Sequence, residues 1–290
     1  EFCTRADCCC GCPPIMDRRA DIKFYGSSTF EINPSRRFMA LELEAFGYQD
    51  QKHRKDKSIP HPNVVMKKWN MGAHHDGSIR GENEKEITTS PANGDLLFAQ
   101  TNEIVSAVKN CGAKSNEESG CGLHVHVNVE DLSVEEIQKV ALIYATVEDQ
   151  LYRIWCKGRD TNNYCSPNGP GLKEVCLSEN YENVQTMSDA AYNALRNSGK
   201  GSDRGKRYHG FNLEAHQEHH TIEFRMMGGT LDMKKILSWL GIIGDLFDFA
   251  LGLKLEEAKA VAMACDDSLS LLKMMIRKEH VLKFVDSASK

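Results

Sequence analysis

The stretch Gly122-Leu-His-Val-His-Val-Asn-Val129 carries a clear strand signal, because polar and aliphatic residues alternate along it. Successive side chains of a β-strand point to opposite faces of a sheet. His124, His126 and Asn128 therefore share one face, and the aliphatic residues between them share the other. The pattern predicts a strand over about 121–130 with an apolar face for a core and a polar face for chemistry.

Two other predicted strands repeat this one-sided pattern. In one, Glu42 and Glu44 share a face, and in the other Glu223 and Arg225 do so. A face that merely meets solvent is common in antiparallel sheets, but these faces carry carboxylates, imidazoles and a guanidinium. Carboxylates bind Mg²⁺ or Mn²⁺, imidazole is a further ligand, and arginine binds phosphate with two donors. The combination predicts a site for a metal ion and a nucleotide.

Two further segments are candidates for the same face. Glu86 stands at the start of another expected strand. Asp76 stands in an Asp-Gly turn, so it is either a turn residue or part of the site. His74 and His75 are interpreted as solvated loop residues.

The remaining elements follow from hydrophobic periodicity and capping signals. Ser133 and Glu136 form a capping box that predicts a helix from residue 133 to about 155. Glu148 falls in the apolar stripe of this helix, where we expect a core glutamate paired with an arginine, with a direct ligand role as the alternative. Further predictions are strands over 38–47, 63–71, 207–214 and 220–227, and helices near 95–110, 186–196, 232–253 and 255–282.

Composition limits the class of protein. The chain has 290 residues, a formal net charge of -5, 41% hydrophobic and 27% charged residues. This balance argues against nucleic acid as a partner. The most apolar stretch, 236–253, contains Asp245 and Asp248, which disfavours membrane residence and indicates a buried core helix. No secretory signal is recognised, so a cytoplasmic location is predicted.

Cysteine distribution and loop composition suggest the domain organisation. Five of the eleven cysteines crowd the N-terminus, so residues 1–36 are predicted to be a Cys-rich segment, either part of a zinc site or a tail. Residues 37–290 are predicted to be one catalytic domain. Within it, 156–206 is expected to be an insertion or flap loop, and its cations, Lys206 among them, suit an anionic ligand.

Six short motifs, in order, resemble those of the amidoligases, the ATP-dependent carboxylate-amine ligases related to glutamine synthetase and glutamate-cysteine ligase. The resemblance covers about residues 38–250. The motifs are Ala40-Leu-Glu-Leu-Glu44, Trp69 followed by His75-Asp-Gly-Ser78, Glu86-Ile-Thr-Thr-Ser-Pro91, Gly120-Cys-Gly-Leu-His-Val-His-Val127, Arg207-Tyr-His-Gly-Phe-Asn212 and Thr221-Ile-Glu-Phe-Arg225.

The resemblance implies an α+β, glutamine synthetase-like fold. In that fold a curved, largely antiparallel sheet binds ATP and magnesium on its concave face and packs helices on its convex face. The resemblance also implies roles for individual residues. The implied metal ligands are Glu42, Glu44, Glu86, His124 and Glu223. The implied nucleotide, phosphate or positioning residues are His126, Arg207, Asn212 and Arg225, and Asp76 is implied to bind or deprotonate the amine.

The function predicted is an ATP-dependent, ADP-forming ligase that joins a carboxylate and an amine through an acyl phosphate. Its substrates are small molecules, peptides or proteins, and its cofactor is magnesium or manganese. One alternative is a zinc hydrolase built on His124 and His126. The other is a non-catalytic module that binds a nucleotide or a metal.

Overall fold

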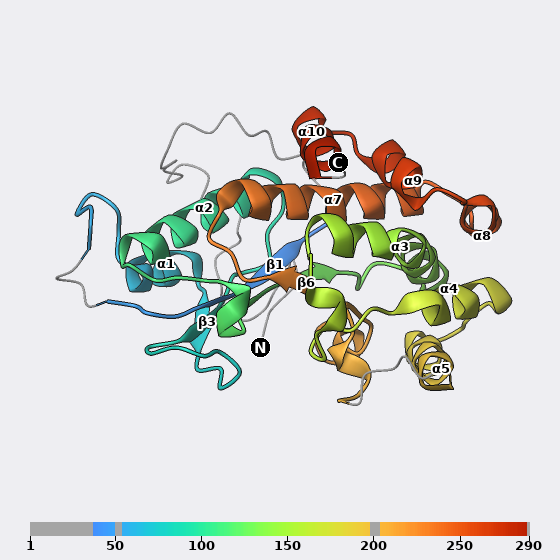
Figure 1. Cartoon of the computed structure of the whole chain (residues 1–290), viewed down its shortest axis with the longest axis horizontal. Helices are drawn as coiled ribbons and strands as arrows, with labels where there is room; N and C mark the ends of the chain where they lie inside the picture. The colour runs from blue at the N-terminus through green and yellow to red at the C-terminus, as the bar shows by residue number, and fades with distance from the viewer. Residues whose placement is uncertain (1–36, 50–53, 198–203, 289–290) are drawn as a thin grey trace. The chain divides into compact units, whose positions relative to one another are not determined.

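The computed structural model describes residues 37–49, 54–197 and 204–288 (Figure 1). The cysteine cluster of residues 1–36, with its predicted zinc site, lies outside the described residues. The chain divides into two compact units, unit 1 (Glu1–Val125 and Gly228–Leu237) and unit 2 (His126–Met227 and Ser238–Lys290). The boundary between them falls within the strand β4.

Unit 1 contains the strands that carry the paired glutamates. Its elements are β1 (Met39–Ala45), α1 (Pro62–Trp69), β2 (Gly72–His74), β3 (Lys85–Thr88), α2 (Gly94–Asn110), the short 3-10 helix η3 (Glu117–Ser119), the first part of β4 (Gly122–Asn128) and the first turn of α7 (Met233–Leu251). The strand β3 pairs antiparallel with both β1 and β2. The predicted strand over 38–47 and the predicted helix near 95–110 are confirmed.

The aliphatic residues of β1 share one face of the strand and form part of the hydrophobic core, as the alternation predicts. Leu41 and Leu43 are 2% and 1% exposed. Burying two such side chains stabilises the unit by about 3–6 kcal/mol before conformational entropy is subtracted. This anchoring fixes the strand register and therefore turns Glu42 and Glu44 to the opposite face.

The strand predicted over 63–71 is wrong, because this segment is the helix α1. The ring Nδ1 of His61 accepts a hydrogen bond from the Asn63 N–H, Pro62 occupies the first turn, and Asn70 ends the helix with φ of 53°. Helical spacing then buries Val65 and Trp69 on one side. These end signals outweigh the β-branched pair in this segment.

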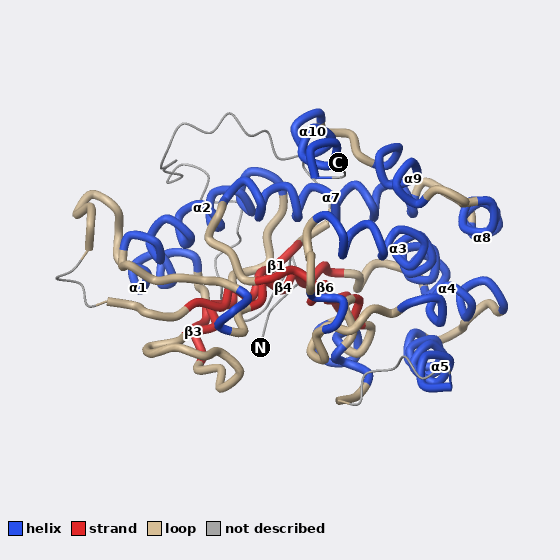
Figure 2. Tube along the Cα trace, in the orientation of Figure 1, coloured by secondary structure: helices blue, strands red, loops and turns tan. Residues whose placement is uncertain are grey.

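Unit 2 contains most of the helices. Its elements are the second part of β4, α3 (Val134–Ile154), η4 (Arg159–Thr161), α4 (Gly169–Ser178), α5 (Val184–Asn197), η5 (Lys206–Tyr208), β5 (Phe211–Asn212), α6 (Ala215–His219), β6 (Thr221–Gly228, whose last residue falls in unit 1), the rest of α7, α8 (Leu255–Ala264), α9 (Ser268–Met275) and α10 (Glu279–Ala288). Helix α3 packs against α4, α8 and α9. Figure 2 separates these helices from the strands by colour.

Several predictions for unit 2 are confirmed and others are corrected. The capping box of Ser133 and Glu136 is present at the start of α3. The strand predicted over 207–214 is reduced to the two residues of β5, preceded by η5. The single helix predicted over 255–282 is three helices, and Asp267 begins the second by accepting from the Leu269 and Ser270 N–H groups.

Helix α4 was not predicted, and it explains the role of Glu148. The Glu148 carboxylate accepts hydrogen bonds of 2.7 Å from the backbone N–H groups of Asn168 and Gly169 at the start of α4. The Tyr144 hydroxyl donates to it at 2.7 Å. The expected arginine partner is therefore wrong: two backbone donors and a tyrosine hydroxyl satisfy this buried carboxylate instead.

The fold class is α+β, as predicted. Among the described residues the strands follow the order β2-β3-β1-β4-β6-β5, and β5 pairs antiparallel with β6. The predicted core helix over 232–253 is confirmed as α7, where Trp239 and Phe247 are fully buried. Within the described ranges no single helix has the length and hydropathy of a membrane span, although α7 and α8 pass that test together across a bend of 117°.

Candidate functional site

Most of the predicted site residues gather in two clusters, each contained in one unit. The acidic cluster of unit 1 comprises Glu42, Glu44, Asp76 and Glu86 together with His124. The strand register positions two of them opposite each other. Glu44 of β1 lies opposite Glu86 of β3, and directly opposed residues of an antiparallel pair project to the same face.

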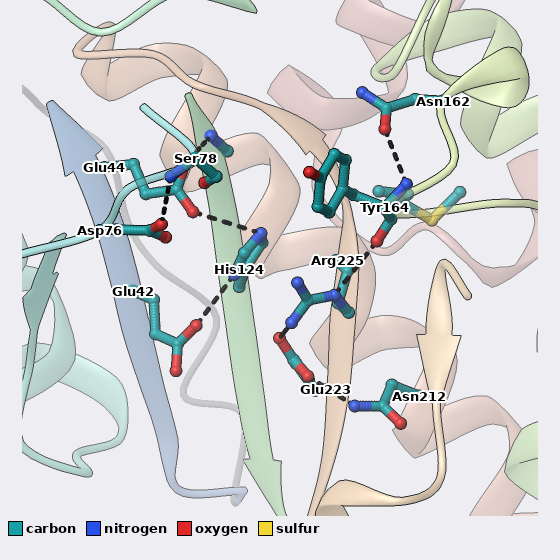
Figure 3. Close-up of polar contacts among 12 residues, drawn as sticks. Glu42, Glu44, Asp76, Ser78, His124, Asn162, Tyr164, Asn212, Glu223 and Arg225 are labelled. Carbon is teal, nitrogen blue, oxygen red and sulfur yellow. Dashed lines mark hydrogen bonds and ion pairs between the residues drawn. The ribbon is translucent and has the colours of Figure 1, made fainter. Parts of the chain in front are cut away.

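His124 contacts both glutamates of β1 (Figure 3). The His124 Nδ1 lies 2.9 Å from the Glu42 Oε2, and its Nε2 lies 3.8 Å from the Glu44 Oε1. The other Glu44 oxygen accepts a hydrogen bond of 2.6 Å from the Gly122 N–H. Glu44 is only 3% exposed, so the adjacent strand holds its carboxylate in one orientation.

Asp76 joins this cluster from the loop after β2. Its Oδ1 accepts a 2.7 Å hydrogen bond from the Ser78 N–H, which is the predicted turn interaction. One carboxylate oxygen from each of Glu44, Asp76 and Glu86 lies within 4.8 Å of the others. Asp76 is therefore both a turn residue and a member of the cluster. His74 and His75 are exposed as expected, but His74 is the last residue of β2 and not a loop residue.

The electrostatics of the acidic cluster fit a cation. Burial raises the pKa of Glu86 to about 7, and the nearby carboxylates of Glu42, Glu44 and Asp76 raise it further, against the lowering effect of His124. Carboxylates this close repel one another unless a proton or a cation intervenes. The carboxylate oxygens of Glu44, Asp76 and Glu86, which lie together, suit Mg²⁺ or Mn²⁺ rather than a soft metal, and His124 adds an imidazole nitrogen beside them. The residues present therefore fit the predicted magnesium.

The second cluster, the Glu223 cluster, lies in unit 2. The register of β5 and β6 places Asn212 opposite Glu223, and the Asn212 Nδ2 donates to the Glu223 Oε2 at 2.7 Å. The Arg225 Nη1 donates to the other oxygen at 2.5 Å. His126 lies 3.8 Å from the same carboxylate, and its Nδ1 lies 2.9 Å from the Thr221 Oγ1.

Two predicted cations lie outside the Glu223 cluster. Lys206 donates to Asp189 on α5, and this hydrogen bond raises the pKa of Lys206. Arg207 is exposed, and its guanidinium carbon lies 5.5 Å from the centroid of the Tyr208 ring. The predicted flap segment 156–206 contains the helices α4 and α5.

The sequence did not point to two groups that contact Arg225. The backbone carbonyl of Tyr164 accepts from the Arg225 Nε at 3.3 Å, and the Tyr208 ring centroid lies 5.8 Å from the Arg225 guanidinium carbon. A backbone acceptor leaves no signal in a sequence. Tyr208 could have been named as a candidate site residue, because an aromatic residue directly after Arg207 is a candidate for a cation–π contact.

Comparison with known protein families agrees with the resemblance that the motifs carry. The chain matches the model of a family described as "Putative amidoligase enzyme" over residues 30–243. No curated protein matches it. Two solved structures are similar. One is a bifunctional glutathione synthetase from Pasteurella multocida, with 10% identity and a TM-score of 0.44 over 87% of this chain and 46% of that one. The other is a novel glutamine synthase homolog, with 12% identity and a TM-score of 0.40 over 87% of this chain and 66% of that one. The chain thus spans less than half of the glutathione synthetase.

Proposed function

Because the chain belongs to the amidoligase family, we propose that it is an ATP-dependent ligase that joins a carboxylate to an amine. A carboxylate oxygen attacks the γ-phosphorus of ATP, the bond to ADP breaks, and an acyl phosphate forms. The amine nitrogen then attacks the acyl carbon and phosphate leaves, which gives an amide or isopeptide bond. This order needs no activated protein nucleophile, because phosphoryl transfer needs positioning and charge neutralisation above all.

The observation that carries this proposal is the acidic cluster. Glu42, Glu44 and Glu86 would hold magnesium or manganese, with His124 beside them, and the resemblance assigns Glu223 as a metal ligand as well. When bound, the metal neutralises phosphate oxygens and orients the nucleotide. The raised pKa of Glu86 supports this assignment, since crowded carboxylates gain most from a cation.

The cations of unit 2 would act on the phosphates. Arg225 has a planar guanidinium that can grip two phosphate oxygens, and Glu223 and the Tyr164 carbonyl fix its direction. Arg207 and Lys206 would approach from the segment before β5, and His126 would donate to a phosphate oxygen. Asn212 orients the Glu223 carboxylate from the adjacent strand.

Asp76 is the proposed acceptor of the amine proton. One of its oxygens is already directed by the Ser78 N–H, so the carboxylate is held at a defined position in the loop. A carboxylate attracts the ammonium form of the amine and accepts its proton as the nitrogen attacks. The proton therefore passes from the amine nitrogen to an oxygen of Asp76.

Hydroxylamine tests the reaction without knowledge of the natural amine. We expect that the protein, with ATP, magnesium and a panel of amino-acid and dicarboxylic acids, forms a hydroxamate from at least one acid and releases ADP in equal amount. Product formation should need ATP and should be lost in Glu223→Gln. A zinc hydrolase built on His124 and His126 needs no nucleotide. Turnover that is independent of ATP and dependent on zinc would therefore replace the ligase assignment.

A further inference from the structure

Three arginines and two tyrosines of unit 2 converge from three segments of the chain. We call Tyr164, Arg204, Arg207, Tyr208 and Arg225 the arginine–tyrosine cluster. The Arg204 guanidinium carbon lies 4.1 Å from the Tyr164 ring centroid, and the two tyrosine rings meet edge to face with centroids 5.8 Å apart. The Tyr208 ring in turn contacts both Arg207 and Arg225.

The rings provide a physical reason for the convergence. Guanidinium groups repel one another, and each is drawn to the negative face of an aromatic ring. A guanidinium that lies over a ring keeps its N–H donors in its own plane, where they remain available to an oxyanion. The two rings therefore hold these cations close together.

The tyrosine backbone adds to this arrangement. The Tyr164 carbonyl accepts from the Arg225 Nε, so the same residue holds Arg225 through its main chain and Arg204 through its ring. Arg225 is only 8% exposed, whereas Tyr164 is 39% exposed. The cluster thus runs from a buried arginine, which also contacts Glu223, to an accessible edge formed by Tyr164 and Arg204.

We propose that the arginine–tyrosine cluster is a triphosphate-binding site in which Arg204 is a further binding residue and Tyr164 positions it. This inference rests on the proposed function, which already assigns Arg207 and Arg225 to phosphate. A polyphosphate chain carries several charges along its length, and three guanidinium groups match it better than they match a single carboxylate. Arg204 is one of the cations of the segment 156–206 that the sequence predicts to suit an anionic ligand, and its contact with the Tyr164 ring gives it a defined position.

Inorganic triphosphate is the probe, because it contains the phosphates without base, sugar or reaction. By calorimetry, we expect Arg204→Gln to weaken triphosphate binding about tenfold, the loss typical of one charge-assisted contact. Tyr164→Ala should weaken it by a similar factor, since Arg204 loses its ring, whereas Tyr164→Phe keeps the ring and should bind as the wild type does.

Arg196 provides the matched control. Its guanidinium carbon lies 5.9 Å from the ring centroid of Tyr192 on α5. Arg196 is therefore an exposed arginine that contacts a tyrosine ring outside the cluster. Arg196→Gln should leave the triphosphate affinity unchanged. Equal losses in Arg196→Gln and Arg204→Gln would reveal a general effect of charge and would overturn the assignment.

The outcome for this site is separable from that of the ligase reaction. Triphosphate binding that depends on Arg204 but is not accompanied by hydroxamate formation would keep the site and reject the ligase. Hydroxamate formation with unchanged triphosphate affinity in Arg204→Gln would keep the ligase and reject the site. A wild-type protein that does not bind triphosphate would also reject the site.

Discussion

At the scale of single residues, Glu44 tests the metal assignment. Glu44→Gln removes a negative charge and keeps an oxygen that can accept from the Gly122 N–H. Loss of a residue that only supports a metal ligand typically lowers metal affinity or activity 10–100-fold. Because Glu44 is a proposed ligand itself, we expect ATP turnover to fall at least about 100-fold. Stability without metal should not fall, since one of several like charges is removed. Turnover near that of the wild type at limiting magnesium would show that Glu44 is not a ligand.

Asn212 is a second residue whose surroundings allow a definite prediction. Its Oδ1 accepts from the Glu214 N–H at 2.9 Å, so its Nδ2 must face Glu223. Asn212→Asp keeps the first contact and sets two buried carboxylates against each other. We expect a loss of about 3 kcal/mol in the free energy of unfolding. Asn212→Ala should cost less, because it creates no repulsion, and the reverse order in urea titrations would contradict the assigned amide orientation.

At the scale of elements, α4 depends on a carboxylate of another helix. Burial raises the pKa of Glu148 to about 7 from 4.5, although the N–H groups of Asn168 and Gly169 and the Tyr144 hydroxyl oppose the shift. The folded chain therefore keeps this proton over a pH range in which the unfolded chain has released it. The stability contributed by this group is present below about pH 4.5 and is lost as the pH rises to 7.

This linkage can be measured by comparing the wild type with Glu148→Gln. Between pH 5 and pH 7 the wild type should lose about 2 kcal/mol of unfolding free energy through this group, and the variant should not. Every other titrating group is common to both proteins, so the difference between their pH profiles isolates Glu148. Parallel profiles in urea unfolding would mean that the carboxyl keeps its ordinary pKa. Glu135→Gln, at an exposed position of α3, serves as the control.

The same elements explain what the sequence could predict. Alternation is a local property, so β1, β4 and β6 and their polar faces could be read directly, and the Ser133 capping box predicted the start of α3 correctly. Helix α4 could not be read, because a distant glutamate caps it and its Gly-Pro-Gly start resembles a turn. Helix α1 was misread, because the ring of His61 acts there as the cap. Interactions through backbone donors or unusual caps give no periodic signal.

At the scale of the whole molecule, magnesium should stabilise the fold. The chain carries a formal net charge of -5, and part of its negative charge is concentrated in the acidic cluster. A cation that binds only the folded chain adds about 2.7 kcal/mol at 100 times its Kd. For a chain of this size, that corresponds to a rise of roughly 4 °C in the midpoint of thermal unfolding.

Added chelator should reverse this rise. Glu44→Gln should show little of it, because the variant lacks one carboxylate of the acidic cluster. Glu82→Gln removes an exposed acid of unit 1 outside the cluster and should respond to magnesium as the wild type does. Sodium chloride at the same ionic strength separates binding from screening, since screening acts on every surface charge alike. An equal rise in the unfolding midpoint with sodium would mean that the cation only relieves general charge repulsion. The assignment of a metal site to the acidic cluster would then be rejected.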